Sequence, residues 1–154
     1  MVEQKWFEDF KVGDRFYIPS KTITAAYFLL AAALTGNNHP IHHDAEYAKK
    51  TVFGRCPAPG GMLTAMTAPG ASNLSPHIQE SLIALLEEHS RYLKPVFVGD
   101  TVTPQLEVEE LVPKKGKGVL KLRVTITNQN GDRVLEGYTL VMLKCRDTVP
   151  AGGR

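Results

Sequence analysis

The sequence predicts a protein of the α+β class, with helices and loops in its first half and a sheet in its second half. The stretch AAYFLLAAAL, residues 25–34, is apolar all round a helical axis, as in a buried helix. Between residues 120 and 126 every second residue is Leu, Val or Ile, which is the period of a half-buried strand. A chain of 154 residues with 43% apolar composition is long enough for one core. We therefore treat residues 1–147 as a single domain and residues 148–154 as a flexible tail.

Two helices are bounded by capping residues. Thr24 precedes the apolar stretch as an N-cap, and Gly36 follows it as a C-terminal stop. Asp44 precedes AEYAKK, residues 45–50, and is better explained as the cap of that short helix than as a catalytic acid. We expect the first helix to be buried, because a solvated helix would have a polar face.

Two segments give conflicting signals. A helix that begins near Gly61 meets Pro69 within about two turns, so it must be short or kinked. In SLIALLEEHSRYLK, residues 81–94, the Leu, Ala and Glu residues favour a helix, whereas Tyr92 and the Val and Phe residues that follow favour a strand. Local propensity alone favours a helix over residues 81–88.

The second half of the chain predicts three long strands. Their sequences are TVTPQLEVEELV, GVLKLRVTITN and RVLEGYTLVMLK, separated by PKKGK and QNGD. The Asn130-Gly131 pair is a strong signal for a hairpin turn between the last two strands.

Charge and composition argue against several classes of protein. The formal net charge is only +2, and no basic face interleaved with aromatics is present, so we expect no nucleic-acid partner. The longest apolar run is about half a membrane span and the N-terminus lacks a signal-peptide pattern, so we expect a soluble, cytoplasmic protein with no membrane partner. Cys56 and Cys145 are far apart, which favours neither a disulfide framework nor a zinc knuckle.

One polar segment, LTGNNHPIHHDAEYA at residues 34–48, concentrates side chains that could carry chemistry. Asn residues after a Gly are also good turn formers, so a plain turn is the alternative reading. The three His residues do not predict a metal site, because Pro40 prevents a regular helix between them and their spacing fits no standard zinc motif.

Three segments together resemble the MaoC-like acyl dehydratases, also called (R)-specific enoyl-CoA hydratases. The polar segment is similar to the family signature G-D-x-N-P-apolar-H over Gly36 to His42, and FGRCPAPGGML and RYLKPVFVGDTV follow in the family's order and spacing. The resemblance runs from about Phe7 to about Leu143. It implies a hot-dog fold, in which a curved antiparallel sheet wraps a long central helix, and a strand rather than a helix over residues 81–94. It also implies a homodimer joined edge to edge, or a dimer of such dimers.

The resemblance further implies reversible hydration of a 2-enoyl thioester, carried by coenzyme A or by an acyl carrier protein. No cofactor is expected beyond the coenzyme A that forms part of the substrate. His42 stands at the position of the family's catalytic His and would be the main acid–base group. Gly61 stands at the position whose backbone N–H receives the thioester oxygen, and Gly60 remains an alternative because the alignment has one extra residue. The family's Asp position, five residues before the His, holds Asn37.

Three departures surround this expected proton-transfer site. An amide at position 37 can orient a water molecule but cannot take a proton at neutral pH. The family's neighbouring Asn is replaced by His39, and a position that is usually polar holds Pro69. The alternatives to a hydratase are therefore a hot-dog thioesterase and a catalytically silent acyl-binding or partner subunit.

The expected substrate-binding residues are His39, Gly60, Met62 and Tyr27. Tyr27 and Met62 are apolar enough to line an acyl tunnel, although simple core packing would require the same residue types.

Overall fold

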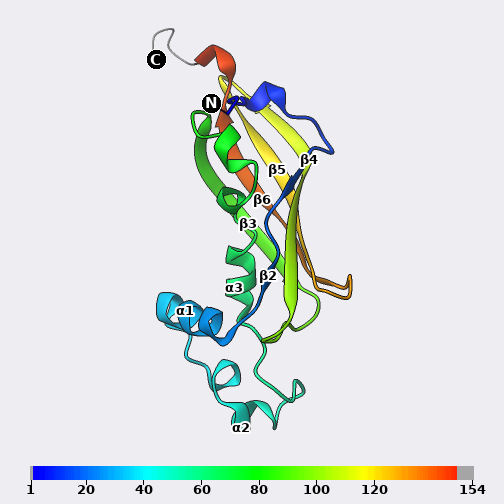
Figure 1. The fold of residues 1–154 in the computed structure, drawn as a ribbon. Coiled ribbons are helices and arrows are strands. Elements are labelled where there is room, and N and C mark those ends of the chain that lie inside the picture. The colour runs from blue at the N-terminus through cyan, green and yellow to red at the C-terminus, as the bar shows by residue number, and fades with distance from the viewer. Residues whose placement is uncertain (1, 149–154) are drawn as a thin grey trace.

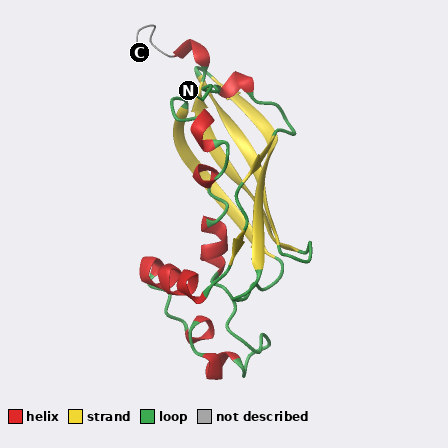
Figure 2. Cartoon of the chain, in the orientation of Figure 1, coloured by secondary structure: helices red, strands yellow, loops and turns green. Residues whose placement is uncertain are grey.

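The computed structural model describes residues 2–148, which form a curved antiparallel sheet with short helices along one side of it (Figure 1 and Figure 2). The strand order is β1-β4-β5-β6-β3, and the short strand β2 pairs with β4. This arrangement confirms the α+β class and the hot-dog fold. The strands are β1 Arg15–Tyr17, β2 Lys21–Thr22, β3 Leu82–Tyr92, β4 Thr101–Lys114, β5 Lys117–Thr127 and β6 Arg133–Lys144.

The core lies between the sheet and the segments that cover its inner face. In β5 the side chains of Leu120, Leu122, Val124 and Ile126 are at most 1% exposed, so the predicted alternation is confirmed. The predicted hairpin between β5 and β6 is also confirmed. Its turn contains Gly131 at a φ of +79°, a left-handed conformation that favours Gly.

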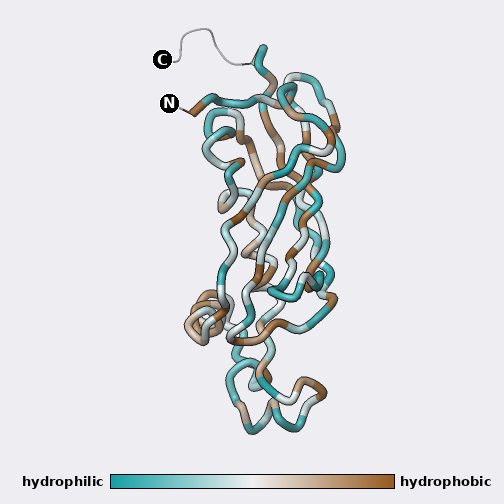
Figure 3. The backbone as a smooth tube through the Cα atoms, turned by 45° about the vertical axis from the view of Figure 1, so that its right-hand side comes forward, coloured by the Kyte–Doolittle hydropathy of each residue, from teal (hydrophilic) through white to brown (hydrophobic). Residues whose placement is uncertain are grey.

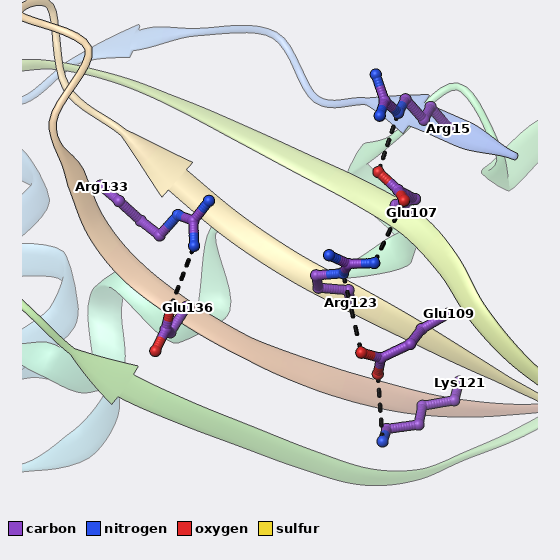
Figure 4. A network of polar contacts seen from close by, with 7 residues as sticks. All are labelled: Arg15, Glu107, Glu109, Lys121, Arg123, Arg133 and Glu136. Atoms are coloured by element: carbon purple, nitrogen blue, oxygen red, sulfur yellow. Dashed lines mark hydrogen bonds and ion pairs between the residues drawn. The ribbon is translucent and has the colours of Figure 1, made fainter. Parts of the chain in front are cut away.

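The outer face of the sheet carries a ladder of charged side chains (Figure 4). Arg15 of β1 and Arg123 of β5 both pair with Glu107 of β4, at N–O distances of 2.9 and 3.3 Å. Arg123 and Lys121 also pair with Glu109. Ion pairs this exposed contribute roughly 0 to 1 kcal/mol each, so the ladder keeps this face polar more than it stabilises the fold.

β3 is a strand along its whole length, as the resemblance implies, so the local preference for a helix over residues 81–88 is wrong. The strand pairs with β6 on one side and forms an edge of the sheet. Gly137 of β6 leaves room for this pairing, because a Cβ there would lie 1.9 Å from the carbonyl oxygen of His89. Ladder hydrogen bonds to β6 and this close approach outweigh the helix propensity of Leu, Ala and Glu.

Short helices connect the strands. The α-helices are α1 Ala25–Thr35, α2 Ala45–Ala48 and α3 Gly60–Ala65; the 3₁₀ helices are Phe7–Asp9, Pro40–His42, Pro69–Ala71, Ser75–His77 and Arg146–Thr148. Figure 1 shows α3 beside the sheet, α1 to the left of α3 at the level of the sheet's lower end, and α2 below the sheet. Within residues 2–148, no helix has the length and apolar character needed to cross a membrane.

The central helix is shorter than the resemblance implies. α3 has six residues, begins one residue before Gly61, and is followed by a separate 3₁₀ turn that starts at Pro69. The expectation of a long central helix is wrong for this chain, whereas the sequence-based prediction of a short or kinked helix is confirmed. Pro69 has no N–H to continue an α-helical ladder, which accounts for the break.

α1 is only partly buried, contrary to the prediction for residues 25–34. Phe28, Ala31 and Ala32 face the protein, but Leu29 and Leu30 are each 66% exposed. Figure 3 shows this apolar coil projecting beside the sheet. Because α1 packs beside α3, on the side away from the sheet, its outward face has no packing partner among the described residues of a single chain.

The predicted starts of the first two helices hold, but α2 ends at Ala48 rather than at residue 50, and one cap differs. Gly36 ends α1 at a φ of +70°, and Asp44 Oδ1 accepts the N–H of Tyr47 at 3.0 Å to cap α2. Thr24 occupies the N-cap position of α1 without a capping hydrogen bond from its side chain. The predicted tail lies almost wholly in residues 149–154, which are outside the described part of the chain.

Candidate active site

His42 is held by one hydrogen bond that fixes the orientation of its ring. It ends the 3₁₀ helix Pro40–His42 and is half-buried. Its Nδ1 lies 2.8 Å from the carbonyl oxygen of Pro57. A carbonyl oxygen only accepts, so Nδ1 carries the hydrogen, and Nε2 of the neutral ring keeps a free lone pair. His42 is therefore oriented as a proton acceptor.

A mostly apolar cavity of about 360 Å³ lies beside this ring. Gly60, the first residue of α3, lines the same cavity. Most of the remaining wall is apolar and comes from Ile41, Phe53, Pro57, Leu63, Leu93 and Val96. The structure thus brings His42 and Gly60 together beside a space suited to an apolar ligand.

The motifs FGRCPAPGGML and KPVFVGD, which are far apart in the sequence, meet at this cavity. The Ala58 N–H donates to the carbonyl oxygen of Val96 at 2.7 Å, and Pro57 and Phe97 form an isolated β-bridge. The segment that accepts the His42 hydrogen bond is therefore anchored to KPVFVGD. This pairing gives a structural reason for the order and spacing of the two motifs.

Asn37 and His39 lie on an exposed loop that contributes to neither of the two cavities described here. Asn37 Oδ1 accepts the His39 N–H at 3.4 Å, and Nε2 of His43 donates to the Asn37 carbonyl oxygen at 3.2 Å. Nδ1 of His39 accepts the Ile41 N–H at 3.2 Å, so the neutral His39 ring carries its hydrogen on Nε2. His39 and His42 thus have opposite tautomers.

The two glycines at the start of α3 have different surroundings. A Cβ on Gly60 would lie 2.8 Å from Cζ of Tyr92, so the Tyr92 ring would have to shift to admit a side chain there. A Cβ on Gly61 would meet nothing within 4 Å. Within residues 2–148, neither glycine N–H has a protein acceptor, as is usual for the first turn of a helix.

Tyr27, Gly61 and Met62 line a second cavity, of about 260 Å³, between α1 and α3. Leu30 and Leu34 of α1, which are exposed to solvent, form part of its wall. The predicted site residues are therefore divided in a single chain. His42 and Gly60 belong to one cavity, and Tyr27, Gly61 and Met62 belong to the other.

Tyr92 was not among the residues that the sequence singled out for the site. It ends β3, lines the His42 cavity, and its hydroxyl lies 2.7 Å from the Thr64 hydroxyl of α3. The motif RYLKPVFVGDTV contains Tyr92, but that motif was used as a sign of the fold alone. Its contact with α3 depends on tertiary packing, so no local pattern could have indicated it.

The charged residue Lys94 of the cavity lining is paired, and the described residues form no ligand set for a metal ion. Lys94, which lines the cavity, donates to Asp132 at 2.7 Å, and this hydrogen bond and the Lys94 charge lower the pKa of the Asp132 carboxyl. Within residues 2–148, no three His, Cys, Asp or Glu side chains are grouped as a metal ion would require.

Comparison with known proteins finds similarity over most of the chain. The family model described as "MaoC like domain" matches residues 9–130. An (R)-specific enoyl-CoA hydratase of Rhodospirillum rubrum is 31% identical over 92% of this chain and 93% of its own length. An enzyme of the same description from Aeromonas caviae is 32% identical over 88% and 97%.

A solved structure from Archaeoglobus, described as a monoamine oxidase regulatory protein, superposes on the chain with a TM-score of 0.87. It is 28% identical in sequence, and the match covers 94% of this chain and 97% of the other.

Proposed function

The chain belongs to the family of MaoC-like domains, and from this membership we propose that it is a hydro-lyase that adds water reversibly to a 2-enoyl thioester. The observation that carries the proposal is that His42, whose ring is held through Nδ1 by the Pro57 carbonyl, lines an apolar cavity together with Gly60 at the start of α3. The substrate would be an acyl-CoA or an acyl-carrier-protein thioester, since relatives are described for both carriers. We expect it to act in the cytoplasm.

His42 would be the main acid–base group. Hydration requires a base to take a proton from the attacking water and an acid to protonate the carbon next to the carbonyl. Nε2 of His42 accepts the first proton while the Pro57 carbonyl stabilises the ring hydrogen on Nδ1. Such help is typically worth about 10² to 10⁴ in rate.

Gly61 is the better candidate for the N–H that binds the thioester oxygen. Gly60 is explained by the Tyr92 ring packed against it, whereas nothing within the described chain requires a glycine at position 61. A position without a side chain and with a free N–H suits the close approach of a ligand.

Asn37 cannot supply the second proton function, so His42 would serve in both proton transfers, with His39 as a hydrogen-bond donor. An amide does not gain or lose a proton at neutral pH, but the neutral His39 ring presents an N–H on Nε2. Asp44 is occupied as the cap of α2. In this mechanism Asn37 orients water, Nε2 of His42 takes a proton from it, and the imidazolium that forms on His42 then protonates the carbon next to the carbonyl.

A second copy of the chain would complete the site. The two cavities that hold His42 and Gly61 are separate in one chain, and β3 leaves one edge of the sheet unpaired. The apolar side chains Leu82, Ile83, Leu85 and Leu86 of β3 are 45 to 51% exposed. Edge pairing of two copies through β3 would cover these side chains and satisfy the free backbone groups.

The test is a product assay with short trans-2-enoyl-CoA substrates. A hydratase removes the absorbance of the conjugated thioester without releasing thiol. Release of free thiol without change in the conjugated double bond would identify a thioesterase. Binding of acyl-CoA with neither reaction would identify a silent binding or partner subunit.

A further inference from the structure

Tyr92 forms a bridge between the edge strand and the central helix. It is the last residue of β3, and its hydroxyl is hydrogen-bonded to that of Thr64, with 2.7 Å between the oxygens. Its ring lies against Gly60, so closely that a Cβ there would come within 2.8 Å of Cζ. The ring is thus fixed by its own backbone, by Gly60 and by Thr64, although half of its surface is exposed.

The contact between Tyr92 and Thr64 lies at the point along α3 where residues stop lining the His42 cavity. Gly60 and Leu63 line the cavity, whereas Thr64 does not. Tyr92 lines the cavity and reaches across to Thr64. An aromatic side chain anchored at both ends acts as a rigid wall, because the hydrogen bond restricts rotation of the side chain away from the helix.

From this geometry we infer that Tyr92 limits the length of the acyl chain that the cavity beside His42 accepts, and that Thr64 keeps the ring in place. The inference rests on the proposed function, because it takes the apolar cavity to be the acyl site. The cavity is apolar apart from His42, Lys94 and the Tyr92 hydroxyl, which suits an alkyl chain. A fixed wall rejects additional methylene groups by overlap, and one methylene in such a pocket typically changes selectivity by about 10- to 200-fold.

The test compares trans-2-enoyl-CoA substrates of four, six, eight and ten carbons. The wild type is expected to prefer the short substrates. Tyr92→Ala should raise the ratio of kcat/KM for the eight-carbon over the four-carbon substrate by at least about tenfold. Thr64→Val keeps the shape of the side chain but loses the hydroxyl, so it should change the same ratio in the same direction by a smaller factor. Tyr92→Phe keeps the ring and should match Thr64→Val.

Tyr138→Phe is the matched control. It also removes a tyrosine hydroxyl that is hydrogen-bonded, in this case to Glu87, but it lies outside the cavity lining. It should leave the length profile unchanged. A folded Tyr92→Ala protein with the wild-type profile would overturn the inference, and Tyr92→Leu serves the same test if the alanine variant does not fold.

Binding separates this inference from the proposed function. Titration calorimetry with saturated acyl-CoAs of the same lengths measures selectivity without turnover. If the wild type binds short chains best, Tyr92→Ala relaxes this preference and no variant hydrates, the length limit stands and the hydratase proposal fails. If the wild type hydrates but Tyr92→Ala alters neither binding nor kcat/KM ratios, the length limit fails and the hydratase proposal stands.

Discussion

His42 combines a fixed tautomer with access to a cavity. Because the Pro57 carbonyl holds the hydrogen on Nδ1, Nε2 is the atom available to a substrate water. We expect His42→Ala to lower kcat by at least about 10²-fold in the enoyl-CoA hydration assay. The melting temperature should change little, because the half-buried ring makes one hydrogen bond.

His77→Ala is the control for His42→Ala. Nδ1 of His77 also donates to a backbone carbonyl, that of Glu3, at 2.9 Å, but His77 lies outside both cavities. Its loss should leave kcat unchanged. A large fall in melting temperature for His42→Ala with activity retained would instead identify His42 as a structural residue.

Asn37 is the main chemical deficit of the proposed site. Asn37→Asp should raise kcat/KM on a short enoyl-CoA, because a carboxylate restores a proton-accepting group while keeping the oxygen that accepts the His39 N–H. The measurement follows loss of the conjugated thioester absorbance. Adding His42→Ala to Asn37→Asp should abolish the gain. A fast wild-type enzyme that Asn37→Asp slows would show that the amide is a working part of a modified mechanism.

At the scale of the elements, the first turn of α3 distinguishes two adjacent glycines. Gly60→Ala should destabilise the fold by roughly 1 kcal/mol, since its Cβ overlaps the Tyr92 ring. Gly61→Ala should not destabilise it, because Ala favours a helix and its Cβ meets no atom within 4 Å. If Gly61 contacts the thioester, however, Gly61→Ala should lower kcat/KM at least about tenfold.

The stability of Gly60→Ala and Gly61→Ala is compared by thermal unfolding, and their kcat/KM by the hydration assay. If Gly61→Ala is fully active while Gly60→Ala is folded but inactive, then Gly60 rather than Gly61 supplies the N–H that binds the thioester oxygen. The two substitutions are matched in chemistry and position, so a general effect of adding a methyl group to α3 would affect both alike.

At the scale of the whole molecule, the free edge of β3 and the exposed face of α1 leave much apolar surface uncovered in one chain. We expect a homodimer or a dimer of dimers, measured as mass by light scattering at micromolar concentration. The double change Ile83→Lys and Leu86→Lys should shift the protein toward monomer and reduce hydration, because like charges would meet along the β3 edge.

Val52→Lys is the control for added charge, since Val52 is 97% exposed and belongs to the turn between α2 and α3 rather than to a strand. It should leave the mass unchanged. A wild-type protein that is folded by circular dichroism, monomeric in mass and fully active would contradict the proposal that a second copy completes the site.

The sequence by itself determined the features that depend on neighbouring residues. The alternation in β5, the glycine in the turn before β6, the cap at Asp44 and the break at Pro69 all follow from local backbone geometry and side-chain period. Similarity to a known family supplied the hot-dog fold and the candidate roles of His42 and Gly61, because the order and spacing of its motifs reflect how they meet in space.

Only the tertiary structure decided the features that depend on contacts between distant segments. The strand β3, which the family resemblance implied against local propensity, forms because β6 provides its hydrogen-bond ladder. α1 remains half exposed because it packs beside α3, on the side away from the sheet. Gly60 is explained by the ring of Tyr92, a residue 32 positions later in the chain. These contacts join residues that are distant in the sequence and form only in the folded protein. Local propensity and periodicity describe only a few neighbouring residues, so they could not predict these contacts.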